Sequence, residues 1–219
     1  MYYHNGNSVV GVLIDWDLAT VISSSGIPNT DRTGTIPFMA LQLLSGEPVV
    51  HMLRHDAESY IWLFLWVCGC SDGSKEVLVA PYKMWRKLDM LTCKVDRRAF
   101  LSDVNLQRIN VSEHHAPNGL FCLFLAILLQ QLRTYIWQDI PTSADRDLED
   151  QKDMALYKAL LPKFREVRAE LNKKFSPKDW YDKELRSNID DYIQTTVFSI
   201  TQSIRRSRPP HAHFVFSQI

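Results

Sequence analysis

Two aspartates follow an apolar stretch close to the start of the 219-residue chain. Asp15 comes directly after Val-Leu-Ile, and Asp17 lies two positions further on. A carboxylate at the end of a strand can hold Mg²⁺ against phosphate oxygens, which is one way in which proteins bind nucleotides. An aspartate in such a position can also form a turn or cap a helix. Asp15 alone does not separate these interpretations.

Two further motifs follow the aspartates in a fixed order. Arg-Thr-Gly-Thr-Ile-Pro-Phe-Met-Ala occupies residues 32–40, and Arg-His-Asp-Ala-Glu-Ser occupies residues 54–59 at the start of a very apolar stretch. Residues 20–35 are rich in Ser, Thr, Gly, Asn and Pro, which predicts a loop. After Asp15 the chain is therefore expected to form a long loop and then a short helix over residues 40–44.

Together these motifs resemble the fungal-type protein kinase family. The residues that carry the resemblance are Leu-Ile-Asp-Trp-Asp-Leu-Ala at 13–19, the motif at 32–40, and His-Asp-x-Glu-Ser-Tyr with Leu-Trp-Val at 55–67. The clear resemblance covers residues 9–101. It implies the helical C-terminal lobe of a protein kinase-like fold, and transfer of the ATP γ-phosphoryl group to a Ser or Thr hydroxyl.

The resemblance also implies a role for each matching residue. Asp15 would ligate Mg²⁺ and so contribute to Mg-ATP binding, and Thr35 would orient the catalytic loop and the incoming substrate. Ile36 and Pro37 would shape the substrate-binding wall, and Asp56 would brace the backbone of the catalytic loop.

The chain also departs from the kinase pattern. The Gly-rich loop, the strand lysine and the catalytic-loop aspartate precede the metal-binding aspartate in kinases, and residues 1–14 spell none of them. We therefore expect this chain alone not to transfer phosphoryl groups, and to bind Mg-ATP weakly or not at all. Gln42 replaces a glutamate that forms a buried ion pair in kinases. Because glutamine cannot form that ion pair, the sequence does not decide whether residues 33–42 are held rigidly.

Several functional interpretations remain open. The chain can be a truncated kinase, or a stand-alone remnant that acts as a non-catalytic, pseudokinase-like binding module on the same scaffold. Ile-Asp-Trp-Asp at 14–17 also resembles the metal motif of small-molecule kinases of the aminoglycoside or choline type, but the motif at 32–40 argues against that family. The expected partners are a protein substrate, a partner protein, or a second copy that associates through an exposed lobe interface.

The remaining sequence predicts a mainly α domain over residues 1–204 and a flexible, basic and Pro-rich tail over 205–219. A hairpin is expected at the start, with strands over 1–4 and 9–14 around Asn5-Gly6. Asp56 is expected to cap a central helix, buried on all sides, that ends near Cys70. Further helices are expected near residues 81–91, 96–102, 120–137, 150–173 and 186–204.

Composition limits the partners and the location. Lys plus Arg equals Asp plus Glu at 25 each, which gives no support for nucleic acid as a partner. The apolar runs 60–68 and 119–129 are shorter than the ~20 residues of a membrane span, so buried helices are expected there and no membrane association. The four cysteines include no Cys-x-x-Cys pair, which favours a reduced, intracellular protein, either cytoplasmic or nuclear.

Overall fold

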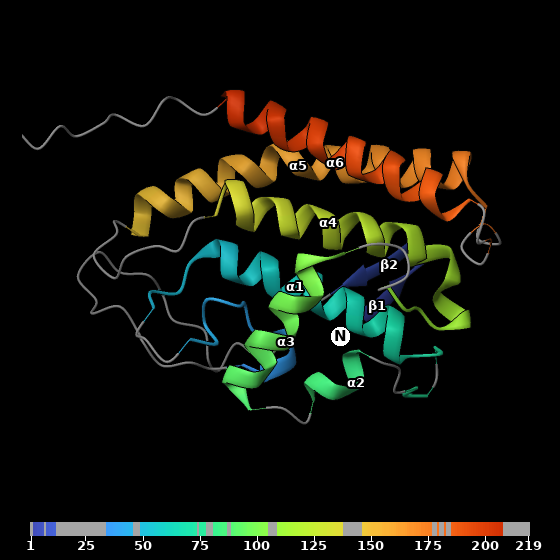
Figure 1. The fold of residues 1–219 in the computed structure, drawn as a ribbon, viewed down its shortest axis with the longest axis horizontal. Helices are drawn as coiled ribbons and strands as arrows, with labels where there is room; N and C mark the ends of the chain where they lie inside the picture. The colour runs from blue at the N-terminus through green and yellow to red at the C-terminus, as the bar shows by residue number, and fades with distance from the viewer. Residues whose placement is uncertain are drawn as a thin grey trace, which may run out of the picture.

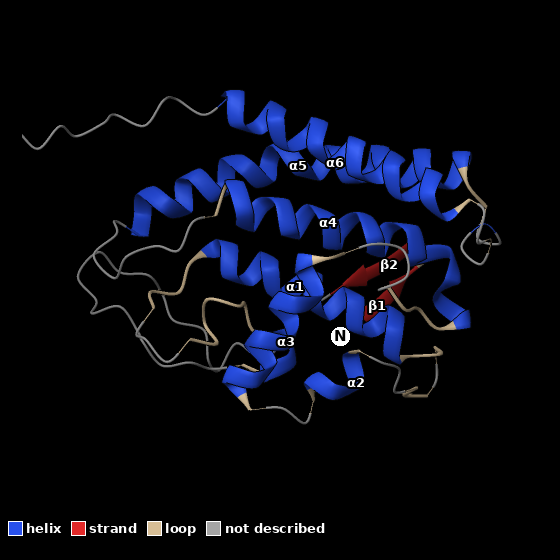
Figure 2. Ribbon diagram, in the orientation of Figure 1, coloured by secondary structure: helices blue, strands red, loops and turns tan. Residues whose placement is uncertain are grey.

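The computed structural model confirms a mainly helical fold (Figures 1 and 2). The description below covers residues 2–6, 8–11, 34–45, 49–73, 75–77, 81–86, 89–104, 109–137, 146–176, 179, 182 and 185–207. The helices are α1 (Leu53–Cys70), α2 (Tyr82–Trp85), α3 (Met90–Ser102), α4 (Gly119–Tyr135), α5 (Arg146–Lys174) and α6 (Arg186–Ser207). Two 3-10 helices, η2 (Ile36–Phe38) and η3 (Glu113–Asn118), join them, and β1 (Tyr2–Asn5) pairs antiparallel with β2 (Ser8–Gly11).

Helix α1 is the central element of the described fold. It packs against α4, α5, η2, η3 and α2, and Trp62 and Leu65 on it are fully buried. Each apolar side chain buried in this way contributes about 1.5–3 kcal/mol. Burial on all sides was nevertheless a wrong expectation, because Tyr60, Leu63 and Val67 are exposed at helical spacing. One apolar stripe of α1 is therefore left uncovered by the described residues.

The start of α1 also differs from the prediction. Asp56 does not cap the helix, because the helix begins at Leu53, and Asp56 lies in its first turn. The backbone N–H of Met52 donates instead to Nδ1 of His55 at 3.1 Å, and the N–H of His55 donates to the Met52 carbonyl at 2.9 Å. These two bonds satisfy groups that a helix N-terminus leaves unpaired.

An aromatic cluster joins α1 to α2 and α3. Trp62 and Trp85 meet edge to face at 5.3 Å between ring centroids, and Trp85 and Phe100 do so at 5.5 Å. The helix expected over 81–91 stops at Trp85 in the described structure, because Asp89 starts a new one by accepting from the N–H of Thr92 at 3.0 Å. These contacts place α3 beside the motif at 32–40.

Helix α4 forms the inner layer between α1 and α6 (Figure 1). The helical stretch Glu113–Tyr135 is long and apolar enough to cross a membrane, and no other described helix is. This is weak evidence of a span, because core helices share these properties and 61% of the apolar window is buried. Phe124, Ile127 and Leu128, for example, are fully buried, as expected for the run 119–129.

Two long helices cover the remaining sides of α4. The expected helices near 150–173 and 186–204 are confirmed as α5 and α6, although α6 continues to Ser207 into the region predicted as tail. Helix α5 runs parallel to α1, and α4 runs antiparallel to both (Figure 1). The N–H of Leu53 donates to Asp150 at 2.8 Å, which fixes the first turn of α1 against α5.

A buried ion pair strengthens this junction. Nε of Arg54 donates to Asp153 at 2.8 Å, and a second guanidinium nitrogen donates to Glu149 at 2.6 Å. Arg54 is 5% exposed and Asp153 is fully buried. Burial raises the pKa of Asp153, and the hydrogen bonds from Arg54 oppose that shift. The pair therefore holds two charged groups in the core only while both are present.

We expect Arg54→Ala to lower the free energy of unfolding by about 3–5 kcal/mol, because it leaves the buried carboxylate of Asp153 without its cation. The matched control is Arg86→Ala, which breaks an exposed pair with Glu76 and should cost about 0–1 kcal/mol. Urea unfolding of the two variants measures the difference, and equal losses would contradict the buried role of Arg54.

Candidate functional site

The candidate site is the described part of the second motif, residues 34–45, together with the side chains that hold it. Asp15, Asp17 and the loop before residue 34 lie outside the described residues, so the proposed metal ligand has no described surroundings. Thr35, Ile36, Pro37 and Asp56 are described. Among the described residues, no group of three or more His, Cys, Asp or Glu side chains could hold a metal ion.

A tight turn opens the segment. Gly34 has a φ of +150°, and a Cβ there would lie 3.1 Å from Cγ of Met39, so glycine suits both the backbone and the space. The carbonyl of Thr35 accepts from the N–H of Phe38 at 2.8 Å, which starts η2. Pro37 is buried, whereas Thr35 is exposed. The turn therefore places the Thr35 hydroxyl at the surface, while buried Pro37 packs the turn against the core.

Glu58 on α1 holds the next part of the segment. Its side chain is 1% exposed, and its Oε1 accepts from the N–H of Leu41 at 2.9 Å and from Nε1 of Trp62 at 3.0 Å. Its Oε2 accepts from Arg133 of α4 at 2.7 Å. Three elements therefore meet at one buried carboxylate, and charge-assisted hydrogen bonds of this kind are among the stronger ones in proteins.

Arg97 on α3 holds the same segment from the other side. Its guanidinium donates to the Met39 carbonyl at 2.7 Å and lies 3.9 Å from the centroid of the Trp62 ring. Nε and one terminal nitrogen have no hydrogen-bond partner in the described structure, and the cation rests on aromatic faces instead. Burial lowers the pKa of Arg97 to about 10, so the group remains charged at neutral pH.

The uncharged side chain of Gln42 has a hydrogen-bonding partner on α1. Its Oε1 lies 3.0 Å from Nε2 of His55, and Nδ1 of His55 accepts from the N–H of Met52. These partners assign the proton of the neutral imidazole to Nε2. Burial is the largest cause that lowers the pKa of His55 to about 3, so the ring is neutral at pH 7. Gln42 is thus matched by a neutral partner, while Arg133 pairs with Glu58.

Asp56 has a different environment from these buried groups. Its side chain is exposed and pairs with Nε2 of His51 at 2.9 Å. Among the described residues, no buried backbone group forms a hydrogen bond with the Asp56 side chain. Its role toward a catalytic loop remains a prediction, since no such loop is among the described residues.

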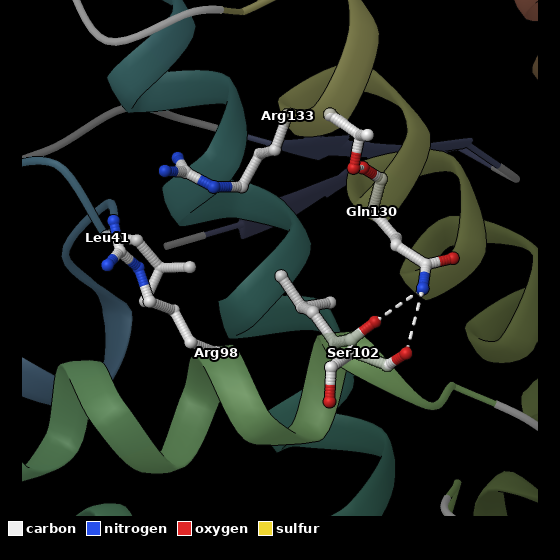
Figure 3. A pocket seen from close by; sticks show the side chains of 7 residues that line it. Leu41, Arg98, Ser102, Gln130 and Arg133 are labelled. Atoms are coloured by element: carbon white, nitrogen blue, oxygen red, sulfur yellow. Dashed lines mark hydrogen bonds between the residues drawn. The ribbon is translucent and has the colours of Figure 1, made fainter.

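A pocket of about 310 Å³ lies beside Leu41 between α3 and α4 (Figure 3). Arg98 and Arg133 line it, and Gln130 closes one side by donating to the carbonyls of Leu101 and Ser102. The guanidinium of Arg98 extends toward Leu41 in this view. Because Arg133 already pairs with Glu58, Arg98 is the lining cation that makes the pocket suited to an anionic group.

Sequence reasoning found the segment but missed what holds it. Glu58 belongs to the motif at residues 54–59, but the motif predicted no role for it. A carboxylate inside a very apolar helix was nevertheless a signal for a buried charge. Arg133, in the last turn of an apolar helix, gave the same signal. Arg97 lies between the half-buried Asp96 and the exposed Arg98 on α3, and nothing in its spacing marked it as buried.

Comparison with known proteins identifies part of the chain. Residues 3–68 match the family model described as fungal protein kinase, which confirms the family recognised from the motifs over that segment. The match ends in α1, so the resemblance expected for residues 69–101 stays a prediction. No curated protein and no solved structure matches the chain.

We expect Glu58→Gln to destabilise the protein by about 3–5 kcal/mol, because Arg133 and Arg97 lose the buried charge that they face. Hydrogen exchange at the Leu41 amide should also accelerate. The matched control, Glu166→Gln, breaks an exposed pair with Lys163 and should leave the free energy of unfolding nearly unchanged. Unchanged exchange at Leu41 in a destabilised Glu58→Gln protein would show that the carboxylate does not fix the segment.

The depressed pKa of His55 predicts a pH dependence. In the unfolded chain imidazole titrates near ~6.5, whereas the folded value is about 3. As the pH falls below ~6.5 the unfolded state binds the proton first, so stability is lost by up to ~1.4 kcal/mol per pH unit. His55→Gln removes the titrating group. Urea titrations between pH 7 and 4 should therefore show a shallower decline in the variant, and parallel curves would refute this assignment.

Proposed function

From the fungal protein kinase match of residues 3–68, we propose that this chain supplies the activation segment and helical lobe of a fungal-type Ser/Thr protein kinase. The observation that carries the proposal is the fixed position of residues 34–45 on α1. Glu58 binds the Leu41 N–H, and Arg97 binds the Met39 carbonyl. A substrate-binding segment must be held rigidly for phosphoryl transfer, which depends on positioning.

Each motif residue has a role in this proposal. Asp15 ligates Mg²⁺ and places the γ-phosphate of ATP, while the exposed Thr35 faces the incoming protein substrate. Half-buried Ile36 and buried Pro37 form the wall beside it. The arginine-lined pocket next to Leu41 suits an acidic side chain of that substrate.

The chain by itself does not contain the whole active site. Residues 1–14 include no Gly-rich loop, strand lysine or catalytic-loop aspartate. We therefore propose that the isolated chain binds Mg-ATP weakly or not at all and transfers no phosphoryl group. Activity needs these groups from another polypeptide segment, which makes a protein the expected partner. An intracellular location, cytoplasmic or nuclear, is part of the same proposal.

A non-catalytic binding module is the second candidate. The observation that favours it is that Glu58, His55 and Arg97, all on described helices, hold residues 39–42. Such a segment can present Thr35, Ile36 and the arginine pocket to a protein without chemistry.

Joining the first half of a fungal protein kinase ahead of residue 9 tests the kinase proposal. We expect Mg²⁺-dependent phosphorylation of Ser or Thr in a protein, little phosphorylation of aminoglycosides or choline, and a loss of ~100-fold or more in Asp15→Ala. Asp182→Ala, at an exposed position, is the control and should retain activity. A folded hybrid that is inactive on proteins would favour the binding module.

Calorimetry of Mg-ATP with the chain alone tests the second expectation. Weak binding that disappears in Asp15→Ala supports a partial nucleotide site, and no heat in either protein supports a remnant. Clear Mg²⁺-dependent ATP turnover by the purified chain would overturn the proposal that it lacks a complete active site.

A further inference from the structure

An apolar groove of about 480 Å³ lies on α1, α4 and α5, away from the segment 34–45. Helices α1 and α5 form its two walls and α4 its floor, and we name it the α1–α5 groove. The residues that line it are Leu53, Asp56, Ala57, Tyr60, Ile61, Phe64, Phe121, Leu125, Leu132, Trp137, Tyr157, Leu160, Leu161 and Phe164. Its lining on α1 extends from Leu53 to Phe64, which corresponds to a length of ~17 Å.

The walls of the groove are exposed in a way that favours an occupant. Tyr60 on α1 and Leu161 on α5 are each 59% exposed, although both are large apolar residues at the edge of an apolar groove. Contiguous exposed apolar surface of this kind usually marks a binding site. Because α1 and α5 run parallel over α4, the groove suits an elongated apolar segment rather than a compact ligand (Figure 1).

One end of the groove contains two polar groups without partners. Nε1 of Trp137 and the hydroxyl of Tyr157 are buried and have no hydrogen-bond partner in the part of the chain described. Trp137 is only 4% exposed. Burial raises the pKa of Tyr157, so its hydroxyl remains a donor. Both atoms are inaccessible from the open groove, so they do not select its occupant.

The C-terminal end of α6 lies at this same end of the groove. The guanidinium carbon of Arg205 is 5.1 Å from the centroid of the Tyr135 ring, and Tyr135 lies two positions before Trp137. Helix α6 ends at Ser207, and residues 208–219 lie outside the described part of the chain. Those residues begin with Arg-Pro-Pro and finish with Phe-Val-Phe-Ser-Gln-Ile.

Charge is complementary at this end. Asp56 lines the groove, and Asp147 and Asp150 lie in the first turns of α5, whose Asp150 binds the start of α1. The last turn of α6 carries Arg205 and Arg206, and Arg208 follows it. Residues 214–219 carry no Asp, Glu, Lys or Arg, so these charges favour the approach of the chain that leaves α6 and not the binding of its last residues in the groove.

We propose that residues 214–219 of the same chain dock in the α1–α5 groove as an extended segment. An extended segment of that length spans ~20 Å, which matches the groove. Phe214 and Phe216 then point to one side, into the groove, because side chains alternate in an extended chain.

The connection between α6 and the groove also favours an extended chain. Residues 208–213 provide a connection of up to ~20 Å from the end of α6, which is near Trp137 already. Pro209 and Pro210 favour an extended connection rather than a continuation of α6.

Hydrogen exchange of the full chain tests the proposal. We expect the amides of residues 214–219 to exchange at least ~10-fold more slowly than in a free peptide of the same sequence. Leu161→Glu places a charge on the groove wall and should abolish this protection, whereas Phe198→Glu, equally exposed but on α6 outside the groove, should retain it. The replaced side chains are exposed, so both variants should fold.

A tail variant provides an independent measurement. Phe214→Ser with Phe216→Ser should raise the binding of an apolar fluorescent dye to the groove several-fold, and adding the free peptide 208–219 should reverse this increase. Free-peptide exchange rates throughout residues 214–219 would overturn the proposal. So would protection that vanishes on dilution, because the tail would then occupy the groove of a second copy.

Discussion

The buried carboxylate of Glu58 is the constraint on which the described structure depends. A charge in the core is costly unless every oxygen is paired, and Glu58 is paired by groups from residues 34–45, α1 and α4. These elements cannot move independently without leaving a buried charge or a buried N–H unpaired. The position of residues 34–45 is therefore determined by the same carboxylate that determines the packing of α1 on α4.

A second set of buried charges works in the same way at the start of α1. Arg54 pairs with Asp153 and Glu149, which fixes the direction and register of α5 along α1. Between the two sets, α1 carries an apolar face that the described residues leave open. The buried charged groups thus fix how α1, α4 and α5 pack. The uncovered apolar face of α1 lies at the α1–α5 groove that this packing leaves open.

The replacement of a kinase glutamate by Gln42 does not remove the charge that holds the segment. Arg133 of α4 pairs with Glu58, and Gln42 faces a histidine that burial keeps neutral. A neutral amide suits a neutral imidazole, since a carboxylate there would favour protonation of His55. Gln42 and His55 are therefore best understood as one matched pair.

Long helices were predictable from the sequence because their apolar periodicity is local. The expected helices near 120–137, 150–173 and 186–204 are close to α4, α5 and α6. Shorter elements were less predictable, since α2 ends at Trp85 and α1 begins before Asp56 through bonds that apolar spacing does not encode. The 3-10 turn η2 at Ile36–Phe38 was not predicted, although Gly34 and Pro37 beside it restrict the backbone locally.

The sequence by itself determined the mainly helical class, the order of the kinase-like motifs and the similarity of residues 3–68 to the fungal protein kinase family, because these depend on residues close together in the chain. Only the tertiary structure decided which charges are buried and with which partners. Glu58 and Arg133 are 75 positions apart, and Arg54 and Asp153 are 99 apart. Pairing over such distances results from helix packing, which a pattern of neighbouring residues does not specify.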